Sequence, residues 1–99
     1  MKKLIVGLML ASSLAMADAQ TDKMGYCEAI EKLASTVMTN RQAGVSLSAM
    51  IKLADTDLMK SVVLGAYDTS RYSTEKYKEQ AITRYKNQWA TTCYKEMLK

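Results

Sequence analysis

Residues 22–46, DKMGYCEAIEKLASTVMTNRQAGVS, form the stretch that decides the fold. Small and apolar side chains recur in it at steps of three and four residues, the period of a helix with one buried face. This stripe consists of Cys27, Ile30, Ala34, Val37 and Met38, with Arg41 at its end. We therefore predict a helix over 22–42 that Thr21 or Asp22 caps. Gly44 stands where a left-handed cap would end it.

Caps and apolar spacing predict three further helices downstream. A short helix is expected over 46–54, with Ser46 as its cap, and a third helix over 57–67. The last helix is expected over 74–97, with Ser73 as its cap. The side chains expected to face the core are Leu47, Met50, Ile51, Ala54, Leu58, Met59, Val62, Val63, Ala66, Ile82, Tyr85, Trp89, Cys93 and Met97.

The N-terminal segment has the three parts of a secretory signal peptide. A pair of lysines precedes an apolar run over 4–16, and two small-x-small sites follow. We predict a signal peptide over 1–17, with cleavage after Ala19 as the alternative, and a single domain over 18–99. The apolar run of about 13 residues is shorter than the ~20 that a spanning helix needs. We therefore expect no stable membrane anchor after cleavage, and a periplasmic or secreted location.

Cysteine usage predicts the architecture of the exported domain. Cys27 and Cys93 are the only cysteines, and an oxidising compartment favours their single intramolecular pairing. A disulfide brings its two Cα atoms within about 7 Å. The helices over 22–42 and 74–97 are then antiparallel neighbours. We predict an all-α fold, a compact bundle of about four helices whose first and last are joined by this disulfide.

Composition argues against an enzyme. The chain has no histidine, so a Ser-His-Asp triad and the usual catalytic zinc sites are excluded. No glycine-rich phosphate loop occurs. The pairs Glu28 and Glu31, and Glu75 and Glu79, are one turn apart, a spacing that exposed helices commonly carry for solubility. We expect no catalytic residues, no metal and no cofactor.

The segment before and into the last helix interleaves basic and aromatic residues. The candidate partner-binding residues are Arg71, Tyr72, Lys76, Tyr77 and Lys78. In a cytosolic protein this pattern would indicate nucleic acid, which export argues against. The functional interpretation is contact with an anionic partner, which is an acidic protein face, a phosphate-rich outer-envelope lipid or a cell-wall polymer. The alternative is a solvated helix start whose tyrosines pack by their rings.

Two features of the apolar stripe have two interpretations each. Arg41 is a candidate anion-binding residue at the helix junction, or a partly buried residue that needs Asp68 or carbonyl groups as its partner. The methionines are either core residues or the lining of an adaptable groove. These methionines are Met38, Met50, Met59 and Met97.

The chain resembles small exported two-cysteine helical proteins of proteobacteria and their prophages, most of them uncharacterised. The resemblance rests on Cys27, Arg41-Gln42-x-Gly44-x-Ser46, Ala66-Tyr67, Tyr77, Trp89 and Cys93. In general plan the chain is also similar to periplasmic chaperones of the HdeA type, which keep their cysteines closer in sequence, and to periplasmic immunity proteins. This plan implies a non-enzymatic protein that binds or inhibits an envelope protein, a phage- or toxin-related one included. The alternatives are a stress chaperone and an enzyme acting on envelope glycans. Oligomeric state stays open.

Overall fold

A computed structural model shows that the protein is all-α. It describes the backbone of residues 2–99 and the side chains of residues 22–99. Four helices and no strand occur in this part of the chain. They are α1 (Lys2–Ala43), α2 (Leu47–Lys52), α3 (Asp57–Tyr67) and α4 (Glu75–Met97). The predicted fold class is confirmed.

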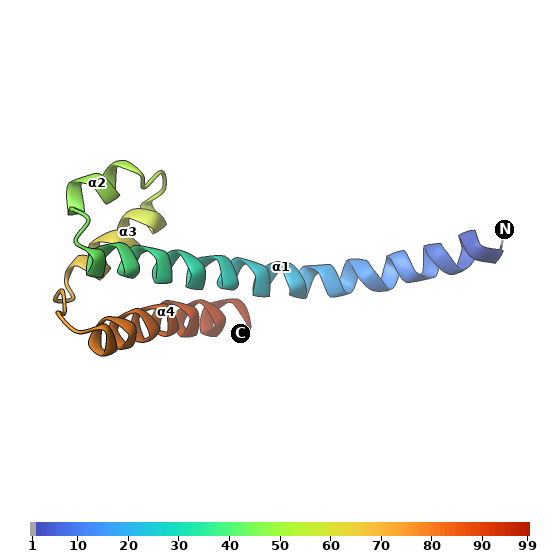
Figure 1. Cartoon of the computed structure of the whole chain (residues 1–99). Coiled ribbons are helices and arrows are strands. Elements are labelled where there is room, and N and C mark those ends of the chain that lie inside the picture. The colour runs from blue at the N-terminus through green and yellow to red at the C-terminus, as the bar shows by residue number, and fades with distance from the viewer. Residues whose placement is uncertain (1) are drawn as a thin grey trace.

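The two long helices form the frame of the domain. Helix α4 runs back alongside the C-terminal half of α1, while α2 and α3 lie on the other side of α1 in the view of Figure 1. The predicted disulfide joins Cys27 to Cys93, with their Cα atoms 5.5 Å apart. The antiparallel pairing of the first and last helices is therefore confirmed.

Helix α1 begins earlier than the sequence pattern predicts. It is continuous from Lys2, so Thr21 and Asp22 lie inside it and do not cap it. The physical reason is that the preceding residues include several alanines, leucines and methionines, which favour helix, and no proline interrupts them. The predicted signal peptide over 1–17 lies outside the residues whose side chains are described, and its cleavage stays a prediction.

The end of α1 follows the prediction. Gly44 has a φ of 90°, the left-handed conformation that glycine adopts without steric cost. Its N–H donates to the Arg41 carbonyl at 3.1 Å, and the N–H of Val45 donates to the Asn40 carbonyl at 3.0 Å. These two bonds are the Schellman pattern, which satisfies carbonyls that the helix end would otherwise leave free.

Helices α2 and α3 are capped by hydroxyl groups. Ser46 accepts from the Ala49 N–H at 3.2 Å, and Thr56 accepts from the Met59 N–H at 3.1 Å. Helix α3 has the predicted bounds, whereas α2 is shorter than predicted. Leu47 does not face the core as predicted, since 39% of it is exposed. A helix of six residues buries only one narrow edge, and Met50 occupies that edge.

Helix α4 starts one residue later than predicted. Thr74 is its N-cap residue, with an extended backbone, and it makes no side-chain capping bond. The predicted cap at Ser73 is therefore wrong. The backbone N–H of the preceding Tyr72 is bonded to α1, so the position of the loop is fixed by that contact rather than by a serine cap.

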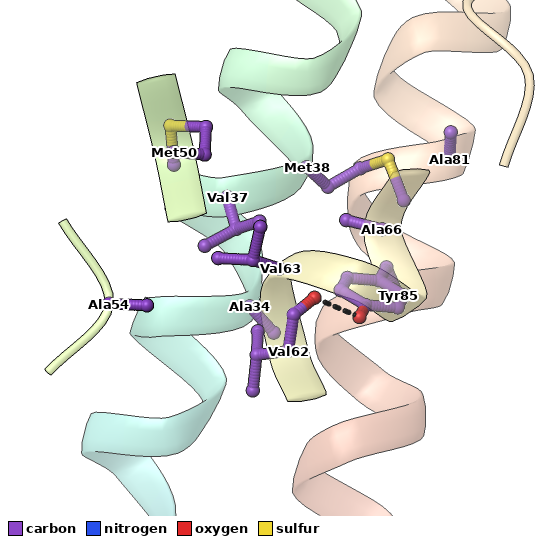
Figure 2. Packing of buried hydrophobic residues seen from close by; sticks show 10 residues of the cluster. All are labelled: Ala34, Val37, Met38, Met50, Ala54, Val62, Val63, Ala66, Ala81 and Tyr85. Carbon is purple, nitrogen blue, oxygen red and sulfur yellow. Dashed lines mark hydrogen bonds between the residues drawn. The ribbon is translucent and has the colours of Figure 1, made fainter. Parts of the chain in front are cut away.

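The core has two connected parts. The larger part, drawn in Figure 2, contains Ala34, Val37, Met38, Met50, Ala54, Val62, Val63, Ala66, Ala81 and Tyr85. The smaller part surrounds the disulfide and includes Ile30. Met38 and Met50 are buried, and Met59 and Met97 pack partly buried against the two parts, so the methionines are core residues. Among the described residues, none of the helices is long and apolar enough to cross a membrane.

Candidate functional site

A buried amide fixes the loop that leads into α4. Gln42 is only 2% exposed, and its Nε2 donates to the Ser70 carbonyl at 2.9 Å. Its Oε1 accepts from the Tyr72 N–H at 2.8 Å. Because both polar atoms of the side chain are bonded to the loop backbone, residues 70–72 are held against the end of α1. Gln42 belongs to the motif on which the resemblance rests, but no structural role was predicted for it.

Arg41 lies beside this contact. Its Nε donates to the Thr69 carbonyl at 3.0 Å, and its guanidinium lies 5.0 Å from the centre of the Tyr67 ring. Of the two partners expected for a partly buried Arg41, the structure shows a carbonyl rather than Asp68. Its role as an anion-binding residue stays a prediction.

Arg71 folds over the end of α1. Its Nε donates to the Gln42 main-chain carbonyl at 3.0 Å. A Cβ atom at Gly44 would be 2.9 Å from the Arg71 guanidinium carbon, so the absence of a side chain at Gly44 gives Arg71 its space. A cation at a helix C-terminus is favourable to the helix dipole. Arg71, predicted to bind a partner, thus also stabilises the C-terminal end of α1.

Tyr72 and Tyr77 form an aromatic pair at the surface. Their ring centroids are 6.1 Å apart, with the planes tilted by 42°. Tyr72 is 37% exposed and Tyr77 is 52% exposed. The backbone of Tyr72 is bonded to Gln42, and Tyr77 belongs to the first turn of α4, so both residues are held in fixed positions.

The predicted binding residues do not all share one surface. Tyr72 and Tyr77 line a hollow of about 310 Å³ with Gln80, Arg84 and Gln88 of α4. Lys78 lies near Glu75 at 3.8 Å, and it lines a different hollow with Arg71 and Tyr72. Lys76 lies with Glu79 and Arg84 on a third. The structure brings the tyrosines together with Arg84, for which the sequence predicted no role.

A second hollow of about 390 Å³ continues the first along α4. It is lined by Asp68, Trp89 and Thr92, and it shares Thr69, Tyr85 and Gln88 with the first hollow. We name the two together the α4 groove. The sequence signal for it is modest: Gln80, Arg84 and Gln88 recur every four residues and so lie on one face of the helix.

The two hollows of the α4 groove differ in charge. Arg84 lines only the first hollow and Asp68 only the second, and neither takes part in an ion pair among residues 22–99. Tyr85 forms the floor between them, and burial raises the pKa of its phenol above the ordinary 10.0. The negative charge of Asp68 acts on that pKa in the same direction.

The paired glutamates are not assembled into a larger acidic site. Glu28 and Glu31 line a shallow hollow together with Lys32 and Lys86, and Glu75 lies near Lys78. Within the part of the chain that the structure describes, no three potential metal ligands come together.

No protein-family model matches the chain, and neither a curated protein nor a solved structure matches it.

Proposed function

We propose that this chain is a small exported protein that acts without catalysis, by binding another protein of the cell envelope. The periplasm is the proposed location. The observation that carries the proposal is the pair of exposed rings, Tyr72 and Tyr77, fixed beside Arg84 by the buried amide of Gln42.

Two physical arguments support a binding role for this surface. Tyrosine and arginine are among the residue types that contribute most to protein–protein affinity. A rigid surface loses little conformational entropy when it binds, and the bonds from Gln42 to the loop supply that rigidity. The Cys27–Cys93 disulfide is consistent with an oxidising compartment.

Site-specific photo-crosslinking tests the proposal. The full chain is expressed in a Gram-negative bacterium with a photo-reactive amino acid in place of Tyr77, and crosslinks are identified by mass spectrometry. We expect one defined envelope protein to be captured at this position. The control carries the same amino acid in place of Lys60, an exposed residue of α3 that lines neither hollow of the α4 groove.

A further variant distinguishes specific binding from nonspecific adhesion. Tyr72→Ala removes one ring but keeps the backbone N–H that Gln42 accepts, so the fold is retained. We expect it to reduce the crosslink at Tyr77 at least threefold. Equal capture at Lys60 and Tyr77, or no capture at Tyr77, would overturn the proposed function.

A chaperone of the stress-response type is a second candidate, and one observation favours it. Leu53 is 69% exposed and Leu64 is 51% exposed, so the α2–α3 side carries apolar surface in the folded state. With no histidine in the chain, an acid response would have to come from carboxylates. The test measures how well the protein suppresses the aggregation of a client protein near pH 3. A loss of suppression in the double variant Leu53→Ser with Leu64→Ser would support this candidate, and full suppression by that variant would refute it.

A further inference from the structure

We propose that the α4 groove binds an extended peptide segment of the partner protein, one that carries an acidic and a basic side chain. The acidic side chain would pair with Arg84 and the basic one with Asp68. This inference rests on the proposed function and specifies the chemistry of its partner.

The dimensions of the α4 groove fit a short extended chain. It runs along α4 from Tyr77 to Thr92, which at a rise of about 1.5 Å per residue is ~22 Å. An extended peptide advances about 3.3 Å per residue, so roughly seven residues span this length. The two hollows share Thr69, Tyr85 and Gln88 and therefore form one path.

The charges of the two hollows define the ligand. Arg84 of the first hollow and Asp68 of the second are both exposed, and among residues 22–99 neither is neutralised by an ion pair. A segment with one charge of each sign pairs with both residues, whereas a uniformly acidic or uniformly basic segment places like charges together in one hollow.

The polar side chains that line the α4 groove suit a peptide main chain. The side-chain amides of Gln80 and Gln88 each contain donors and an acceptor, and so complement the N–H and C=O groups of an extended backbone. Tyr72, Tyr77 and Trp89 supply ring surface for the intervening side chains. A neutral glycan would use the rings and amides but would leave both charges without partners, so the observations favour a peptide.

Binding of defined heptapeptides tests the inference. Five fluorescein-labelled peptides share one frame of leucine and threonine and differ at two positions. Two of them hold Glu with Lys, one in each order, and the other three hold two Glu, two Lys or two Gln. Anisotropy is measured on the full disulfide-bonded chain. We expect the better of the two mixed-charge peptides to bind three- to tenfold more tightly than the peptides with two Glu, two Lys or two Gln, the range expected for two partly exposed charge pairs.

Charge reversal in the protein should change this preference in a defined way. Arg84→Glu gives both hollows an acidic residue and should favour the peptide with two Lys, whereas Asp68→Lys gives both a basic residue and should favour the peptide with two Glu. Neither side chain is buried or bonded in the core, so both variants should fold, which circular dichroism checks. Lys60→Glu is the matched control and should keep the preference of the unaltered protein.

The outcomes separate this inference from the proposed function. Preferences that do not follow the charge reversals, no binding below about 1 mM, or tighter binding of chitin oligosaccharides that the same variants leave unchanged would each overturn the peptide proposal. If Tyr77 still crosslinks one envelope protein in that case, the proposed function stands and only its groove assignment fails.

Discussion

The side-chain amide of Gln42 is buried where α1 ends, and both its polar atoms are bonded to the loop before α4. A buried donor or acceptor that loses its partner costs about 1–3 kcal/mol, because it has already given up its bonds to water. One side chain therefore supports the position of Tyr72 and, through it, one wall of the α4 groove.

Gln42→Ala should lower the free energy of unfolding by about 3 kcal/mol, since it leaves the Tyr72 N–H and the Ser70 carbonyl unpaired and adds a cavity. Urea unfolding followed by circular dichroism measures the loss. Gln80→Ala, at an exposed position of α4, is the control and should change stability by less than about 0.5 kcal/mol. Equal stability of the two variants would contradict the bracing role.

The residues of the site were predictable only in part. The pattern of α1 identified its buried stripe, because a helical period can be counted along one segment. The role of Gln42 was not predicted, because its partners are backbone atoms 28 and 30 residues away and no pattern of side chains in the sequence indicates such contacts. Arg84 and Asp68 were not predicted to share a groove, because the groove exists only where the end of α3 meets α4.

At the scale of elements, α3 and α4 meet closely at Gly65. The Tyr85 hydroxyl donates to the Val62 carbonyl, as the dashed line in Figure 2 shows. A Cβ at Gly65 would be 2.6 Å from that hydroxyl oxygen but 3.5 Å or more from the ring carbons. The glycine is thus required by the hydroxyl group and not by the ring.

Gly65→Ala should destabilise the protein by about 1–2 kcal/mol, because the Tyr85 hydroxyl has to leave the Val62 carbonyl. In a Tyr85→Phe background the same substitution should instead stabilise by up to about 1 kcal/mol, since alanine is the better helix former and the close contact is gone. Chemical denaturation of the four proteins of this cycle measures the coupling. The same sign in both backgrounds would contradict the contact.

Stability should also depend on alkaline pH through Tyr85. Its pKa is raised in the folded state, so above pH 10.0 the unfolded chain loses this proton more readily than the folded one. The contribution is complete below pH 10.0 and is lost as pH rises through the folded pKa. Unfolding at pH 9 to 11 should show a steeper decline for the native protein than for Tyr85→Phe; parallel declines would contradict it.

At the scale of the whole molecule, the two long helices are tied at both ends of their contact. The Cys27–Cys93 disulfide joins them at one end, and the bonds of Gln42 and Arg71 hold the connecting loop at the other. The architecture was predictable because two cysteines permit one intramolecular pairing, and that pairing fixes the direction of both helices. The start of α1 was not predictable, because a capping residue marks the start of a helix only where the residues before it are not helical.

Removing the disulfide should cost about 4 kcal/mol, the value that the chain-entropy relation gives for a loop of 66 residues. Thermal unfolding of the oxidised protein, the reduced protein and Cys27→Ser with Cys93→Ser measures this. The reduced protein and the double variant should have the same melting temperature, well below that of the oxidised protein. Melting temperatures that agree in all three would show that the helix contacts alone hold the fold.

The same covalent link encloses every turn between the helices. The exposed turn at Leu53 is the kind of segment that proteases cut first. A cut there separates α1 and α2 from α3 and α4 along the chain, yet Cys27 and Cys93 lie on opposite sides of the break and keep the two fragments in one molecule. In a protease-rich compartment the two fragments therefore separate only if the disulfide is also reduced.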